Sequence, residues 1–316
     1  MRFYIPPQTY SLDRRLFLRG ATQCAALSLL PRFLEPRSTR TSQIPESLVS
    51  KIRDQLLAMI NEERALASVP PVSIDELANR VATAHALDMA QKNFASHWGS
   101  DGFKPYQRYS FAGGTHATEE NISSANNTWS MRPAALKQDV AYLHVRLYSE
   151  AAPNDGHRKT ILSPYNTHVG FGIAVQELRL RVVELFVARH LEIAELKRQA
   201  KPGAKLDFSG RVITPEHKLV QIEVLYEPLP VPPELSWLRT IRPYSLPEDA
   251  ITLRLRLPKP SRYFDGSSGV IESDGRNFRT KIPLFRSEPG IYTIICWVRK
   301  GSEKAFIATE VCVKAE

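Results

Sequence analysis

The feature that most constrains the fold of this 316-residue chain is a change of hydrophobic pattern near Lys201. Before that point, apolar residues recur at three- and four-residue spacing, which predicts amphipathic helices. After it, short runs typical of strands alternate with turns that contain proline and glycine. A chain of this length accommodates two ordinary domains. We therefore expect an α+β protein in which a helix-containing domain precedes a small all-β domain.

The first half of the chain shows three helical patterns and two strand patterns. The expected elements are helices over residues 45–68, 73–89 and 133–147 and strands over residues 168–175 and 181–189. Ser73 with Glu76 has the spacing of a capping box, so the second helix is expected to open at Ser73. Pro133 suits the first turn of the third helix. Residues 105–118, which include Gly113-Gly114, are expected to be irregular.

The second half contains six short strand patterns separated by turn signals such as Asp265-Gly266 and Pro289-Gly290. The expected strands cover residues 206–213, 219–226, 251–257, 276–284, 291–298 and 305–314. This spacing predicts an antiparallel sandwich of immunoglobulin-like build. Cys296 and Cys312 lie on successive strands around a turn near Gly301, several positions out of register. We expect both to be buried thiols rather than a disulfide.

The formal net charge of +9 is concentrated at the N-terminus. Residues 1–40 hold seven arginines against Asp13 and Glu35, a net charge of +5. The remaining positive charge is scattered among acids, whereas nucleic-acid binding requires clustered Lys and Arg. No apolar run reaches the ~18 residues that a membrane helix needs. We therefore expect neither nucleic-acid binding nor a transmembrane segment.

Residues 1–44 are typical of an export signal followed by a linker. Arg14-Arg15 precedes Phe17-Leu18 and a modest apolar run, as in twin-arginine signals. The alternative is a basic tail with a chance arginine pair. The signal predicts export to the periplasm or the extracellular space.

Polar motifs of the first half follow the ends of the expected elements. They are Asn61-Glu62-Glu63-Arg64, Ser96-His97, Asp101-Gly102, Arg108, Glu120-Asn121-Ile122, Gly156-His157-Arg158 and Gly170-Phe171-Gly172. In this order they resemble the CAP superfamily (SCP domains) of cysteine-rich secretory, antigen 5 and pathogenesis-related proteins, and its bacterial branch in particular. The resemblance covers about residues 50–190 and implies an α/β/α sandwich. We thus expect a CAP domain over 45–195 and a β-sandwich domain over 203–316.

The resemblance also implies a site, because two His and two Glu of the family converge in a cleft that can hold a divalent metal, often zinc. The matching residues here are His97, Glu120, Glu150 and His157. Residues 151–155 lengthen the link between Glu150 and His157, which departs from the family pattern. Zinc accepts neutral imidazole nitrogen, and nearby carboxylates ligate it or orient the imidazoles. The alternative is a metal-free His–Glu network that joins three loops.

Three functions are compatible with these patterns. The first is an exported binding protein whose His/Glu cleft holds a divalent metal or a small apolar or cell-envelope ligand. The second is a metal-dependent, peptidase-like hydrolase with Glu120 or Glu150 as the base. The third is a structural or adhesive envelope module. No HExxH, GxSxG, phosphate-binding glycine loop or CxxC motif is present, so we assign no catalytic residue and expect a binding protein rather than an enzyme.

Overall fold

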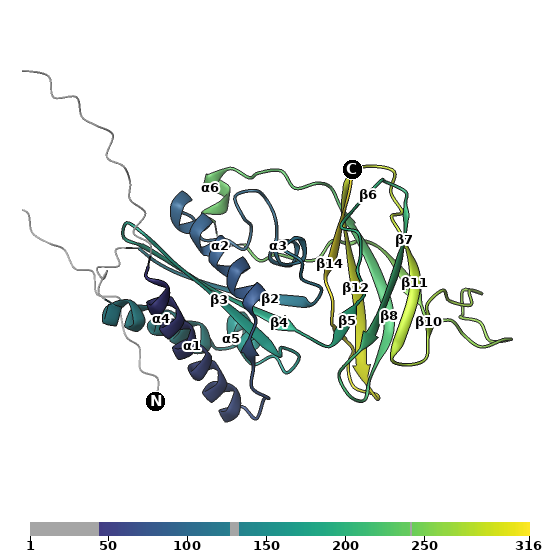
Figure 1. The fold of residues 1–316 in the computed structure, drawn as a ribbon, viewed down its shortest axis with the longest axis horizontal. Coiled ribbons are helices and arrows are strands. Elements are labelled where there is room, and N and C mark those ends of the chain that lie inside the picture. Colours follow the sequence, from purple (N-terminus) through teal and green to yellow (C-terminus); the bar gives the residue numbers. More distant parts are fainter. Residues whose placement is uncertain (1–43, 127–132, 241) are drawn as a thin grey trace, which may run out of the picture. The chain divides into compact units, whose positions relative to one another are not determined.

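The structure, a computed structural model, describes residues 44–126, 133–240 and 242–316 (Figure 1). These residues belong to one compact unit. The expected export signal lies outside them and remains a prediction. None of the helices in these three ranges combines the length and apolar character needed to cross a membrane.

The first half of the described chain forms a four-stranded sheet with helices on both faces. Its elements are α1 (Glu46–Leu66), β1 (Ser73–Ile74), α2 (Glu76–Lys92), α3 (Pro105–Phe111), β2 (Ala117–Asn126), α4 (Pro133–Tyr148), α5 (Gly156–Ile161), β3 (His168–Gln176) and β4 (Arg179–Ala188). The sheet order is β1-β3-β4-β2, and only the short β1 pairs in parallel, with β3. Strand β2 is therefore an edge strand.

The two faces of β4 belong to different hydrophobic cores. Val182 and Phe186 pack with α1 and α4, whereas Val183 and Leu185 pack with α2. Successive side chains of a strand point to opposite faces, so one apolar run serves both cores. The expected α/β/α layering is thus present, with α2 on one face and α1 and α4 on the other (Figure 1).

Two glycines of β3 allow α2 to lie directly against the sheet. A Cβ atom at Gly170 would lie 2.3 Å from the carbonyl carbon of Ala78, and one at Gly172 would lie 2.1 Å from the carbonyl oxygen of Ala82. Both distances are far below van der Waals contact, so the approach requires glycine. The Gly170-Phe171-Gly172 motif therefore serves helix packing.

The Asn61–Arg64 motif near the end of α1 also has a structural role. The side chain of Asn61 pairs with both backbone groups of Val72, at 2.8 and 2.9 Å. The buried guanidinium of Arg64 donates to the carbonyls of four residues, namely Pro70, Ile161, Ser163 and Asn166, at 2.7 to 3.0 Å. These bonds join the end of α1 to the loop that follows α5.

Two expectations about local structure were wrong. Asp75 caps α2, accepting a bond from the Ala78 amide at 2.8 Å, whereas Ser73 belongs to β1. Residues 105–118, expected to be irregular, contain α3 and the start of β2. Helix α3 is too short for a periodic pattern, and its stability comes from burial of Tyr106 and Tyr109.

The second half forms two further sheets around one shared core. Its strands are β5 (Leu191–Ile193), β6 (Gln199–Ala200), β7 (Lys205–Val212), β8 (His217–Glu227), β9 (Asp249–Arg254), β10 (Glu272–Ser273), β11 (Asn277–Pro283), β12 (Gly290–Lys300), β13 (Phe306–Ile307) and β14 (Val311–Ala315). One sheet has the order β10-β11-β7-β5, and the other has β6-β14-β12-β8-β9, with β13 on β12. The short helix α6 (Leu235–Leu238) lies between β8 and β9.

This strand-rich region differs in detail from the expectation. Strand β5 pairs with β7 of this region, although residues 191–193 fall within the range 45–195 expected for the CAP domain. The domain boundaries remain a prediction. The strand expected over 305–314 is divided into β13 and β14. Independent folding of the two domains and an immunoglobulin-like connectivity remain predictions.

The expectation for the two cysteines is confirmed. Cys296 and Cys312 are buried free thiols, and on β12 it is Thr293, not Cys296, that faces Cys312. Burial raises the pKa of each thiol to about 12. Both therefore remain protonated and act as small apolar side chains.

Candidate functional site

The four residues that the family resemblance implied all line one cavity beside β2. The cavity has a volume of about 400 Å³ and is lined by His97, Glu120, Glu150 and His157. Each residue comes from a different local element. His97 lies in the loop after α2, Glu120 on β2, Glu150 just beyond α4, and His157 in the first turn of α5. Glu120 was expected in a loop but lies on a strand.

His97 is held by a buried ion pair. Its Nδ1 lies 2.9 Å from Glu120 Oε1, and Arg108 Nη2 donates to Glu120 Oε2 at 2.6 Å. The same guanidinium donates through Nη1 to the carbonyl of His97 at 2.7 Å. Arg108, on α3, thus fixes both the backbone of His97 and the carboxylate that orients its ring. Charge-assisted bonds of this kind are the strongest that a side chain makes.

Glu120 remains ionised although its side chain is only 1% exposed. Burial alone would raise its pKa, but Arg108 and the nearby His85 and His97 lower it to about 2. His85 lies beneath the site, where burial, followed by Arg108, lowers its pKa to about 4. Its Nε2 lies 2.8 Å from the carbonyl of Ser96. A neutral His85 therefore supports the loop that carries His97.

The second histidine of the cavity has its own carboxylate. His157 Nδ1 lies 2.6 Å from Glu150 Oε1, and the His157 amide donates to Oε2 of the same residue at 3.1 Å. The side chains of His157 and Glu150 are 34% and 24% exposed, so this pair lies at the mouth of the cavity. In each of the two histidines, Nδ1 is thus hydrogen-bonded to a carboxylate.

Strand β2 contacts both histidines because its successive side chains point to opposite faces of the sheet. Glu120 lies opposite Leu185 on the α2 face, where His97 lies, while Asn121 lies opposite Glu184 on the other face. The Asn121 amide donates to the carbonyl of His157 at 3.2 Å and to Glu184 Oε2 at 3.3 Å. Adjacent residues of an edge strand therefore hold groups from two helical layers.

A second histidine–carboxylate cluster lies next to Asn121 and includes its partner Glu184. The sequence motifs did not predict this cluster. His144, fully buried on α4, bonds Glu184 at 2.6 Å through Nδ1 and Glu63 at 3.0 Å through Nε2. Burial alone would lower the pKa of His144, but the two carboxylates raise it to about 10. His144 is therefore a buried cation at neutral pH. Its two ion pairs join α1, α4 and β4, so its role is structural.

A segment of the second half also contributes to the cavity. We call the connection between β8 and β9 the strap, residues 228–240 and 242–248. Leu238 on α6 is fully buried and packs in the same core as residues of α2. The strap is thus anchored beside α2, where Figure 1 shows α6. Tyr244 lines the cavity, with its ring 5.0 Å from that of His97.

Only some atoms of the cavity could ligate the divalent metal that the family resemblance implies. Across the ranges that the structure describes, no group of three or more His, Cys, Asp and Glu side chains is placed to hold a metal ion. The oxygens of Glu120 and Glu150 already accept bonds from Arg108, His97 and His157. The donors that fit a metal are the Nε2 atoms of His97 and His157, which have no hydrogen-bond partner among the described residues. The carboxylates fit the orienting role rather than the ligand role.

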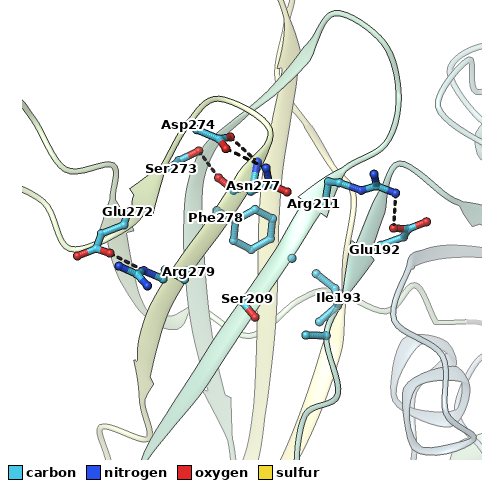
Figure 2. Close-up of a pocket in the computed structure, with 12 residues that line it drawn as sticks. Glu192, Ile193, Ser209, Arg211, Glu272, Ser273, Asp274, Asn277, Phe278 and Arg279 are labelled. Carbon is cyan, nitrogen blue, oxygen red and sulfur yellow. Dashed lines mark hydrogen bonds and ion pairs between the residues drawn. The ribbon is translucent and has the colours of Figure 1, made fainter.

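A larger hollow, of about 800 Å³, lies on the sheet formed by β5, β7, β11 and β10 (Figure 2). Its charged side chains pair with groups that line the same hollow. Arg211 bonds Glu192 at 2.8 Å, Arg279 bonds Glu272 at 2.5 Å, and Asp274 accepts from the Asn277 side chain at 2.8 Å. Exposed pairs of this kind contribute little energy, and this hollow offers no unpaired charge to a ligand. The His/Glu cavity is the stronger candidate.

The comparisons with known proteins agree with the motifs. The family model "CAP: Cysteine-rich secretory protein family" matches residues 57–187, which include all four predicted site residues but not Tyr244. The uncharacterized protein YkwD of Bacillus subtilis is 29% identical over 155 residues, which are 49% of this chain. The chain spans 54% of the length of that curated relative.

Two solved structures are similar to part of the chain. An extracellular protein of Bacillus anthracis that contains an SCP domain is 20% identical, with a TM-score of 0.34, and the match covers 46% of this chain and 44% of that one. An outer surface protein of Borrelia burgdorferi is 16% identical, with a TM-score of 0.35 and coverage of 45% and 95%. By the match of the family model, residues 57–187 form a CAP domain of the cysteine-rich secretory protein family, and a strand-rich region follows it.

Proposed function

We propose that this chain is an exported binding protein whose cleft takes a divalent metal ion, zinc above all, between His97 and His157. The observation that carries the proposal is that both imidazoles line one cavity with Nδ1 bonded to a carboxylate. This arrangement fixes the tautomer and orientation of each ring and leaves Nε2 as the donor. Export is inferred from Arg14-Arg15 and the apolar run after it.

The small number of donors favours reversible binding over a permanent structural metal. Structural zinc sites have four protein ligands, whereas two imidazoles leave positions for water or for a ligand. When bound, the metal would supply a Lewis-acidic centre in the cleft. Such a site is expected to exchange its metal, because affinity rises with each protein donor.

Binding is favoured over hydrolysis by the state of the carboxylates. With a pKa of about 2, Glu120 is too weakly basic to accept a proton near neutral pH. Both oxygens of Glu150 already accept bonds from His157. Neither carboxylate that the hydrolase hypothesis requires is therefore disposed to act as a general base.

Calorimetric titration of the full chain with zinc chloride tests the metal. Wild type is expected to bind one equivalent, and His97→Ala and His157→Ala should each weaken binding about tenfold or more, since one imidazole is a poor ligand set. Glu120→Gln should weaken binding less, because that side chain orients a donor. Binding should also weaken on acidification, because protons compete with the metal for the imidazole nitrogens.

The matched control is His217→Ala, which removes a histidine of the strand-rich region that does not line the cavity and whose Nδ1 lies 2.9 Å from the Pro215 carbonyl oxygen. It should leave the zinc titration unchanged. An absence of binding by wild type would leave the cluster as a hydrogen-bond network. Binding that survives both His97→Ala and His157→Ala would place the metal elsewhere.

A further inference from the structure

A second hollow adjoins the His/Glu cavity and shares both of its histidines. It has a volume of about 380 Å³ and is lined by His97 and His157, by Ile122 and Ser124 of β2, and by Arg242 of the strap. The two histidines thus stand between the hollows. A ligand held at the histidines can extend into either one.

The two hollows differ in charge. The cavity already described is lined by the carboxylates of Glu119, Glu120 and Glu150. Among the described residues that line the adjoining hollow, Arg242 is the one with a permanent charge. The cleft is therefore acidic on one side of the histidines and basic on the other. This asymmetry selects for a ligand whose anionic end lies at Arg242.

The guanidinium of Arg242 is held in place without being neutralised. Its Nε donates to Thr240 Oγ1 at 2.8 Å, and its Cζ lies 4.9 Å from the ring centre of Trp237. Trp237 in turn packs edge-on against Trp98, at 5.2 Å. None of the ion pairs or hydrogen bonds in the described part of the chain uses the two Nη groups of Arg242. The planar Nη pair is thus oriented and available.

We propose that Arg242 is an anion-binding residue of this cleft, which receives the carboxylate or phosphate of a ligand with an uncharged body. The Nη pair matches the two oxygens of such a group, and a guanidinium already held by stacking loses little entropy on binding. The body of the ligand lies along Ile122 and Ser124 toward the histidines. This inference rests on the proposed function in that the cleft binds a ligand, but it requires no metal.

The test uses the full chain with EDTA present, so that no zinc contributes. The probes are acetyl-alanyl-alanine, its C-terminal amide and propyl phosphate, and the readout is the ¹H–¹⁵N signal of the Arg242 Nε–H group. The acid or the phosphate should shift this signal saturably, whereas the amide should not. A shift by the acid identifies a carboxylate ligand, and a shift by propyl phosphate alone identifies a phosphate ligand.

Variants separate the role of Arg242 from a general effect of charge. Binding of the anionic probe to Arg242→Ala, followed through the Trp237 fluorescence, should weaken about tenfold or more. Arg242→Lys should recover only part of it, because ammonium lacks the planar fork. The matched control is Arg239→Ala, since Arg239 lies on the same strap but donates to the Asn93 carbonyl, at 3.0 Å. Equal binding of acid and amide, or equal losses in Arg239→Ala and Arg242→Ala, would overturn the inference.

The zinc titration distinguishes this inference from the proposed function. Arg242→Ala should bind zinc as wild type does, because Arg242 contributes no metal donor. If wild type binds no zinc but still binds the anionic probe through Arg242, the metal proposal fails and the anion site stands. If wild type binds zinc but none of the anionic probes, the anion-site proposal fails and the metal proposal stands.

Discussion

The ring of Tyr244 lies 5.0 Å from the imidazole of His97, although the two residues belong to different halves of the chain. Tyr244 lies outside the part that matches the CAP family model, whereas His97 lies within it. The strap therefore supplies one wall of a cavity whose other walls come from the CAP domain. In this chain the strand-rich region takes part in the candidate site.

Removal of the Tyr244 ring should expose His97. Tyr244→Ala is expected to increase the reaction of His97 with diethyl pyrocarbonate several-fold, because the ring covers one side of the imidazole. Mass spectrometry of the modified peptides gives the measurement. Tyr142→Ala, which removes an exposed tyrosine of α4, is the control and should change nothing. Equal reactivity of His97 in wild type and Tyr244→Ala would mean that the strap does not cover it in solution.

Arg64 should be among the most destabilising positions to change. Arg64→Met removes four bonds to backbone carbonyls and leaves these buried acceptors without a donor. A loss of about 3 kcal/mol or more in the free energy of unfolding is expected. Urea denaturation measures it, with Arg80→Met on the exposed side of α2 as the control, for which about 0.5 kcal/mol or less is expected. Similar midpoints for the two variants would contradict a special role for Arg64.

Because of Glu310, the free energy of unfolding should decrease as the pH rises. Its buried carboxyl accepts bonds from the amide and hydroxyl of Thr118, at 2.8 and 3.2 Å, and burial raises its pKa from 4.5 to about 8. Between these two values the folded protein keeps a proton that the unfolded chain releases. The contribution of Glu310 is therefore complete below about pH 4.5 and is lost as the pH rises through about 8.

Glu310→Gln tests this dependence because a glutamine stays neutral and can still accept from Thr118. Relative to wild type, the variant should gain stability from pH 5 to about pH 8 and level off above it, by about a few kcal/mol in total. Urea denaturation across this range gives the comparison, and Glu303→Gln at an exposed turn is the control. Stability curves that stay parallel for wild type and Glu310→Gln would show that Glu310 is not protonated in the folded state.

The strand-rich region should fold without the CAP domain. Its core of buried residues is drawn from Leu191 to Ala315 and is separate from the cores of the first half. The first half contacts this region through a small cluster of Tyr106, Ile291 and Cys312 and through polar bonds such as that from Thr118 to Glu310. A fragment over residues 189–316 is expected to give well-dispersed amide NMR signals, although isolation also leaves the Glu310 carboxyl without Thr118. A collapsed spectrum would mean that the CAP domain is required for folding.

Export should depend on the arginine pair of the leader. Replacement of Arg14 and Arg15 by lysine is expected to retain the full-length chain in the cytoplasm, because twin-arginine signals are read by a receptor that requires the pair. Cell fractionation followed by immunoblotting measures the distribution. Arg37→Lys, in the linker, is the control. Unchanged delivery across the membrane would refute the twin-arginine interpretation.

The elements with strong periodicity could be predicted from the sequence alone, and the family resemblance predicted four site residues that the structure brings to one cavity. Helix α1 and strands such as β8 and β12 carry apolar repeats long enough to be recognised without their neighbours. His97, Glu120, Glu150 and His157 were placed through short motifs in a fixed order. Glycine at 170 and 172 was part of that order, and the close approach of α2 is the physical reason for it.

Which groups from distant segments contact one another could be seen only in the folded protein. Strand β2 is polar along much of its length because it is an edge strand that lines a cavity, so no apolar alternation marks it. The bonds of His144 with Glu63 and Glu184 join three distant segments, and the strap brings Tyr244 and Arg242 to the histidines. A local sequence pattern shows which face of its own helix or strand is buried. Contacts between distant segments depend on how the layers and connections pack, and no short stretch of sequence encodes them.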